Sequence, residues 1–159
     1  MSLHPQQAER YTREKIVIHI DLEKATWLLD QCVKQRGEDY VYDRDGVCQY
    51  VDNASERVWV DETQRYSRKL TPEKATPSCM IGLALVKAGI PAGLFIELGI
   101  NSMDAPDALD KLSEEGHLTA TNLAGDLFRI AQTHQDLKHS WGFAFEKAKA
   151  GVSGDPEQA

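Results

Sequence analysis

Cysteine is scarce in this sequence, and the few cysteines are far apart. The 159 residues include only Cys32, Cys48 and Cys79, and no two of them form a Cys-x-x-Cys pair. An odd number of widely spaced cysteines argues against a disulfide framework and against a cysteine-based zinc site. We therefore expect reduced thiols, as is usual for a cytoplasmic protein.

Long hydrophobic runs and an excess of basic residues are also absent. No segment approaches the roughly 20 apolar residues that cross a membrane, and the N-terminal stretch lacks the apolar core of a signal peptide. There are 18 lysines and arginines against 25 aspartates and glutamates, which gives a net charge of −7. This charge argues against non-specific binding of nucleic acid, which depends on basic side chains that neutralise phosphates.

What is present is the composition of a globular protein, with 42% hydrophobic and 27% charged residues. A chain of this length fits one domain and can bury a core without disulfides or metals. We expect a flexible N-terminal arm over residues 1–14 and a single α+β domain over 15–150. A disordered tail is expected over 151–159, because that stretch is polar and contains glycine and proline.

Strands are predicted in the first half of the chain. Residues 15–20 and 57–60 are short β-branched runs,. Residues 39–51 are predicted to form a hairpin, because two aromatic and β-branched runs flank Asp45-Gly46, a pair that tolerates positive φ. Between these strands, Asp21 and Gly37 bound a predicted helix, whose apolar face is Leu22, Ala25, Leu28, Leu29, Cys32 and Val33.

Helices are predicted in the second half of the chain. Start signals predict helices that begin at or near Thr76, Ala92, Asp104, Thr119 and Ser140. The polar stretch 61–75 is predicted to be a long loop. The expected fold class is therefore α+β. A small antiparallel sheet, made of the hairpin and one or two further strands, packs against about five helices, and the C-terminal half is all helical.

Cys79 is the residue with the most direct catalytic interpretation. It follows Thr76-Pro77 near the start of an apolar helix, where the helix dipole favours a thiolate, and His117 could act as its base. With "GEDYVYD" before it, "PSCMIGLALVKAGI" loosely resembles the NlpC/P60 cysteine peptidases, although Pro-Ser-Cys stands where that family has Asp-Cys-Ser. We favour the simpler interpretation of a small buried residue, packed beside Ile81, Leu83 and Leu85.

No other group of residues predicts a catalytic, cofactor or metal site. His134 and His139 are five residues apart, and no carboxylate stands at a spacing that completes a ligand set,. We therefore assign no catalytic residue, no cofactor-binding residue and no metal ligand. Trp27 and Trp59 are interpreted as covering the edge of the core, with exposed anchors for a partner as the alternative.

Three stretches, "RGEDYVYDRDGVCQYV", "TPSCMIGLALVKAGIP" and "AQTHQDLKHSWGFAFEKA", carry a further resemblance. They resemble small uncharacterised proteins of actinobacterial phages and prophages, which share a GEDYVY-like hairpin, a PSC-x-x-G helix and AQ-x-x-QD…WG helices. The resemblance covers roughly residues 22–149, and the segment 52–76 is longer than it would lead us to expect. It implies a phage-derived protein that acts inside a bacterial cell, and it supplies no catalytic residue.

Two hypotheses for the function follow. We favour a non-enzymatic protein that binds a host or phage protein in the bacterial cytoplasm. The segment 61–75 is the first candidate for that contact, because it holds Tyr66 among Arg65, Arg68 and Lys69. The alternative is a cysteine hydrolase that uses Cys79 and His117. We expect no cofactor, no membrane and no nucleic-acid partner, and the sequence leaves a homo-oligomer open.

Overall fold

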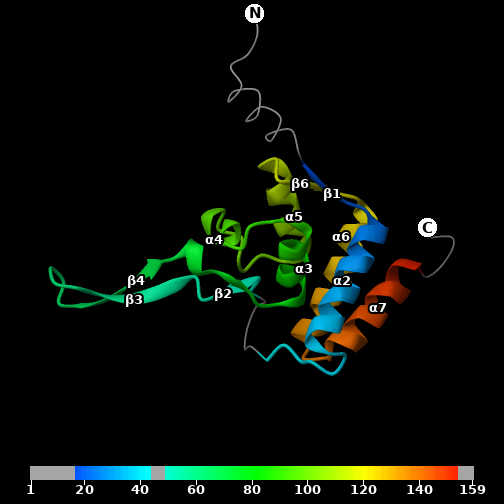
Figure 1. The fold of residues 1–159 in the computed structure, drawn as a ribbon, viewed down its shortest axis with the longest axis horizontal. Helices are drawn as coiled ribbons and strands as arrows, with labels where there is room; N and C mark the ends of the chain where they lie inside the picture. Colours follow the sequence, from blue (N-terminus) through cyan, green and yellow to red (C-terminus); the bar gives the residue numbers. More distant parts are fainter. Residues whose placement is uncertain (1–16, 44–48, 154–159) are drawn as a thin grey trace, which may run out of the picture.

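Helices build the body of the molecule, and a long hairpin projects from it (Figure 1). The structure, a computed structural model, describes residues 17–43 and 49–153. The α+β class and the helical C-terminal half are confirmed. The described helices are α2 (Leu22–Arg36), α3 (Met80–Ala88), α4 (Leu94–Glu97), α5 (Ala105–Glu114), α6 (Asn122–Asp136) and α7 (Trp141–Ser153), with a 3-10 turn, η1, at Pro72–Lys74. Helix α7 therefore extends three residues into the segment expected to be a tail.

The core lies where α2, α3, α5, α6 and α7 meet. The apolar face predicted for α2 is buried except for the partly exposed Leu22, and Cys32 is fully covered within it. Helix α3 is buried on nearly all sides over its first six residues. Its apolar composition is explained by this central position, since a helix that is hydrophobic all round has no solvent face.

Three of the predicted helix caps are confirmed. Side-chain oxygens of Asp21, Asp104 and Ser140 accept hydrogen bonds from main-chain N–H groups three residues further on, at 2.8, 3.0 and 3.2 Å. Each satisfies one of the N–H groups that have no partner within the helix.

Two predicted caps were wrong. Thr76 lies in strand β5 (Thr76–Pro77), and Cys79 caps α3 instead. Thr119 lies in strand β6 (Leu118–Ala120), and Thr121 caps α6. In both places the residues before the helix pair with another strand, so that the helix starts two or three residues later than its local signals indicate.

The strands form three separate two-stranded sheets within the described residues. Strand β1 (Ile18–Ile20) runs parallel to β6, and β2 (Val51–Asp52) runs antiparallel to β5. Strand β3 (Ser55–Val60) runs antiparallel to β4 (Arg65–Leu70). The strand at 57–60 is thus confirmed within β3, whereas the prediction that 61–75 is a loop was wrong, because 65–70 is the second strand of a hairpin.

The hairpin predicted over 39–51 has its turn, Asp45-Gly46, outside the described residues. On one side of it Val41 forms an isolated bridge with Ser140, and on the other Val51 pairs with Pro77. The hydroxyl of Tyr42 donates to the main-chain oxygen of Gln49 at 3.2 Å and links the two sides. The β-bridges of the described parts of this stretch are thus made with distant elements, and the Tyr42 side chain connects its two sides.

Candidate functional site: an exposed hairpin arm

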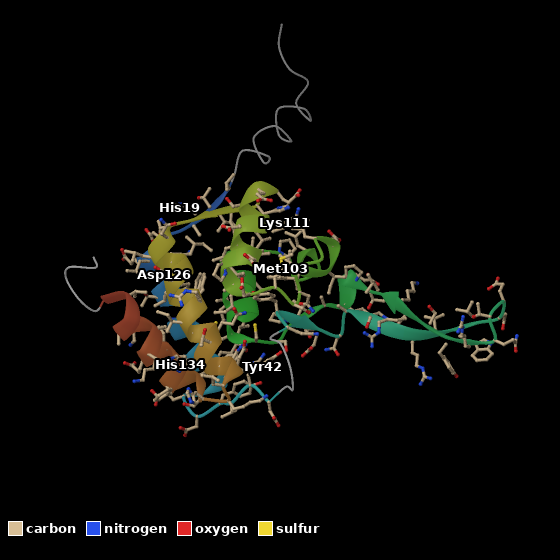
Figure 2. The ribbon with its side chains drawn as sticks, turned by 180° about the vertical axis from the view of Figure 1, so that it is seen from behind. His19, Tyr42, Met103, Lys111, Asp126 and His134 are labelled. Atoms are coloured by element: carbon tan, nitrogen blue, oxygen red, sulfur yellow. The ribbon has the colours of Figure 1, made fainter. Side chains whose placement is uncertain are left out.

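The β3–β4 hairpin, residues 55–70, is called the arm below. It points away from the helices in both views (Figures 1 and 2). Every residue of β4 is exposed to solvent, and β3 alternates between exposed and half-buried residues. The arm is attached at its base, where the N–H of Thr71 donates to the oxygen of Ala54 at 2.6 Å and both residues are buried. The arm is therefore an appendage with a firm base and a free length.

One face of the arm combines aromatic and arginine side chains. The register places Trp59 opposite Tyr66, Arg57 opposite Arg68 and Ser55 opposite Leu70. Opposite residues point to the same face of a sheet, so these six form one surface, called the arginine–aromatic face below. Trp59, Tyr66 and Leu70 are 45%, 54% and 60% exposed on this face. Such side chains are enriched where proteins meet their partners.

The aromatic residues of this face are held in place by one another. The rings of Trp59 and Tyr66 meet edge to face, with 5.1 Å between their centres. The guanidinium carbon of Arg57 lies 4.2 Å from the centre of the Tyr66 ring, a cation–π contact,. The indole N–H of Trp59 donates to Asp61 Oδ1 at 2.8 Å. The face is thus preorganised, which lowers the entropy that binding would cost.

The two faces of the arm differ in how their charges are balanced. On the other face Glu56 stands opposite Lys69 and lies 3.0 Å from Lys74 Nζ, whose hydrogen bond and charge lower the pKa of the Glu56 carboxyl. On the arginine–aromatic face Arg57 and Arg68 stand opposite each other, and neither has an ion pair with a described residue. Like charges placed directly opposite destabilise a ladder, and an anionic partner surface would relieve this repulsion.

Cys79 is confirmed as a buried residue. Its side chain has no exposed surface, and its sulfur accepts the N–H of Gly82 at 3.4 Å as the N-cap of α3. His117 lies on a different element, directly before β6, and is half-buried. A nucleophile must be reachable by its substrate, so this geometry does not favour the hydrolase hypothesis.

Cys32, the other cysteine in the described part of the chain, offers no better nucleophile. Cys32 is fully covered, and burial raises the pKa of its thiol to about 12. A thiol of this kind stays protonated near neutral pH and is a poor nucleophile. Cys48 lies outside the described residues.

The sequence motifs of the three resembling stretches meet in the interior. The N–H of Ser78 donates to the oxygen of Tyr50 at 2.8 Å, and the N–H of Cys79 donates to that of Gln49 at 3.2 Å. Gly82 lies so close that a Cβ atom there would overlap the main-chain carbonyl of Tyr50. The PSC-x-x-G pattern is therefore explained by close packing of α3 against residues 49–50. This contact, together with the glutamine contacts of the next paragraph, is called the buried junction below.

Two glutamines of α6 complete the buried junction. Gln135 Oε1 accepts the first N–H of α3, from Met80, at 2.7 Å, and Gln132 Oε1 accepts the first N–H of α5, from Ala105, also at 2.7 Å. Gln132 Nε2 in turn donates to the hydroxyl of Tyr50 at 3.2 Å. Both glutamines are buried, so they fix where the two helices begin, which gives the AQ-x-x-QD pattern a structural role,.

The remaining candidates of the sequence do not form a site. The Nδ1 atoms of His134 and His139 lie 3.0 Å apart, and burial, the neighbouring His139 and the charge of Lys147 lower the pKa of His134. No group of three or more histidine, cysteine or acidic side chains within the described residues could hold a metal ion. In that same part of the chain, no helix combines the length and the apolar character that a membrane span requires.

Both tryptophans in question are exposed rather than folded over the core. Trp27 is 53% exposed and lines a shallow groove of about 690 Å³ with Phe145 and Lys149 on α7. Trp59 belongs to the arginine–aromatic face. The interpretation that they cover the edge of the core was therefore wrong. Trp59 lies on β3, which leaves the body, and Trp27 lies off the apolar face of α2.

Sequence reasoning found Tyr66, Arg68 and Trp59 but missed Arg57 and Leu70 as members of the same surface. The alternation Arg57–Trp59 was the available signal, because it puts both side chains on one side of a strand. Pairing with β4 could not be read from the sequence, because residues 65–70 have no alternation of apolar and polar side chains,. Comparison with protein-family models, with curated proteins and with solved structures finds no match for this chain.

Proposed function

We propose that this is a non-enzymatic binding protein and that the arm contacts a protein partner through its arginine–aromatic face. The observation that carries the proposal is the pairing of Arg57 with Arg68 beside Trp59 and Tyr66, exposed on a projection that the body does not need for its core. A surface that repels itself electrostatically and exposes ordered aromatic rings costs stability in the free protein. Binding of a partner would recover that cost.

The chemistry of the arm suits recognition rather than catalysis. The six residues of the arginine–aromatic face offer cations, rings and hydroxyls, and none of the six is a histidine or a carboxylate that could act as a general base,. The overall charge of −7 disfavours a polyanion that must also approach the body, so a protein is the better partner than a nucleic acid,. The setting, a phage-derived protein that meets a host or phage protein in the bacterial cytoplasm, is proposed from the sequence resemblance alone.

Removal of the arm tests the proposal. Ala54 and Thr71 are neighbours across the ladder, so a short Gly-Ser linker in place of residues 56–69 can close the gap without moving the body,. We expect the variant to keep its helical circular dichroism and its melting temperature. In affinity capture from bacterial lysate it should lose the proteins that the intact chain retains.

A point variant provides the matched control. Trp59→Ala combined with Tyr66→Ala should also abolish capture, whereas Ser67→Ala, on the opposite face of the same strand, should leave it unchanged. Undiminished capture by the armless protein would contradict the proposed function and direct attention to the groove beside Trp27.

A further inference from the structure

Within residues 17–43 and 49–153, no strand other than β3 pairs with β4, so its outer edge has no partner strand there. Bonded and non-bonded pairs alternate in an antiparallel ladder. Because the N–H of Thr71 bonds the oxygen of Ala54, the next pair, Ser55 with Leu70, is non-bonded. Because the two kinds of pair alternate, the pairs Arg57–Arg68 and Trp59–Tyr66 are also non-bonded,. The main-chain N–H and C=O groups of Tyr66, Arg68 and Leu70 therefore point away from β3.

No strand in the described part of the chain pairs with this edge, and at its base Arg68 and Leu70 line a hollow of about 460 Å³ with Ile96 and Asn101. The sheet has two strands, all of β4 is exposed, and no backbone hydrogen bond from outside the hairpin reaches Tyr66, Arg68 or Leu70. An open row of main-chain donors and acceptors is a template for another strand. The same three residues also carry their side chains on the arginine–aromatic face, so main chain and side chains are offered to one partner together.

The charge of β4 restricts what can pair with it. Its six residues include Arg65, Arg68 and Lys69 and no acidic residue, in a chain whose net charge is −7. A second copy of β4 would bring basic side chains against basic ones, which is unfavourable across a ladder. Basic residues on an edge strand protect it against self-association in this way. They also favour a strand that is acidic.

We propose that the outer edge of β4 binds an extended, acidic segment of the partner protein as a third strand of the arm. The inference rests on the proposed function and gives its partner a chemistry. Main-chain hydrogen bonds to Tyr66, Arg68 and Leu70 supply affinity, as in other cases of strand addition. On one face of the strand, acidic side chains of the segment contact Arg65 and Lys69. On the arginine–aromatic face they contact Arg68, which has Arg57 beside it on β3, and the Tyr66 ring offers an apolar contact.

The probe for the experiment is a synthetic peptide of about eight residues, the sequence Glu-Glu-Thr-Val repeated twice, which puts glutamates on both faces of a strand. It is capped at both ends, and a glutamine-for-glutamate peptide is the control. Binding to the intact chain is followed by calorimetry and by the exchange of main-chain amides. The bound peptide should slow exchange at Tyr66, Arg68 and Leu70, whose N–H groups point outward. Exchange at Ser67 and Lys69, whose N–H groups already bond β3, should change little. This readout needs no variant.

Two substitutions at one position separate side chain from main chain. Arg68→Ala removes the guanidinium and should weaken binding about threefold to tenfold. Arg68→Pro also removes the outward N–H, which an edge strand tolerates because that group does not serve the ladder. It should weaken binding by about a further threefold to tenfold, the worth of one hydrogen bond. Cross-strand contacts between Val58 and Ser67 in NMR spectra verify that the hairpin persists in both variants.

The outcomes distinguish this inference from the proposed function. Equal binding by the two variants, with no protection of the outward amides, would show that side chains alone bind, which overturns strand addition while the arm remains the binding element. Equal binding of the glutamine peptide would overturn the acidic chemistry, as would binding of a DNA or RNA oligonucleotide by the arm in place of the peptide. A dimer of this chain that blocks the same amides would overturn it in favour of self-pairing. If the intact and the armless protein capture the same proteins, that result contradicts the proposed function, and it is read separately from the peptide experiment.

Discussion

The buried junction and the arm contain similar residue types that have opposite roles. In the junction Tyr50 is fully buried, stacked on Phe95 with 5.2 Å between ring centres, and its hydroxyl donates to Met103 O at 2.7 Å. In the arm Tyr66 is 54% exposed, and its ring meets Trp59 and Arg57 of the same hairpin. An aromatic ring in the first place supports the core, and in the second it is available to a partner. Burial, rather than residue type or motif, distinguishes them.

The sequence motifs of this chain lie in the buried junction and not in the candidate binding surface. The patterned stretches, PSC-x-x-G and AQ-x-x-QD, lie in the junction and fix helix starts and close packing. The arm has no motif, and its strand β4 has no apolar periodicity, yet the arm exposes the ordered rings and the facing arginines. Strongly patterned residues in this chain are explained by the fold, and the surface left unexplained by the fold is the better candidate for function.

The largest expected effect concerns thiol reactivity in the core. Cys32 and Cys79 are fully covered, and burial raises the pKa of Cys32 to about 12. Alkylation by iodoacetamide in the native protein should be at least about a thousandfold slower than in urea, because it requires unfolding to a rarely populated open state. Peptide mass spectrometry reads each cysteine separately. Rapid native labelling of Cys79 would revive the hydrolase hypothesis and erase the contrast with the arm.

Gly82→Ala should have the largest effect on stability. The added methyl group would overlap the main-chain carbonyl of Tyr50, which cannot turn aside as a side chain could. We expect the free energy of unfolding in urea to fall by about 3 kcal/mol or more, the upper range for overpacking. Gly125→Ala is the matched control, because its Cβ would meet only Leu109 at 4.0 Å, and a gain of about 0.4–1 kcal/mol is expected there,. Equal effects at the two glycines would show that α3 is not pressed against residues 49–50.

Gln132→Ala should have an intermediate effect. The first N–H of α5 would lose its acceptor, and the Tyr50 hydroxyl would lose a donor, in a place without solvent. A buried donor left without a partner costs about 1–3 kcal/mol, so urea unfolding should show a loss in that range. Gln31→Ala, on the half-buried side of α2, should stay within about 0.5 kcal/mol of the natural protein,. A loss no greater than that of Gln31→Ala would mean that α5 does not depend on the glutamine for its start.

Much of the helical body could be predicted from the sequence, because its signals are local. Asp21, Asp104 and Ser140 act as caps as expected, and Gly37 and Gly89 end their helices with φ of +100° and +116°. The starts of α3 and α6 were misplaced because strands β5 and β6 occupy the residues before them. Pairing of β6 with β1 joins residues about a hundred positions apart, and no local pattern reports such a contact.

The candidate site was predictable only in part, for a related reason. Tyr66 and Arg68 stood out by composition, but β4 has no buried face and hence no alternation of apolar and polar residues,. Such a strand looks like a loop in sequence. The register that brings Arg57 to Arg68 and Trp59 to Tyr66 depends on the pairing of β3 with β4, which became visible only in three dimensions.

Trp59→Ala should have the smallest effect on the whole molecule, and it tests the independence of the arm most directly. The substitution removes the edge-to-face contact with Tyr66 and the hydrogen bond to Asp61. An isolated two-stranded hairpin is marginally stable, so amides of the arm should exchange faster. The free energy of global unfolding should change by less than about 0.5 kcal/mol, because none of the lost contacts reaches the body. Hydrogen exchange and urea unfolding of one sample measure both quantities. A global loss above about 1 kcal/mol would show that the arm is part of the cooperative core, and the distinction between arm and junction would then fail.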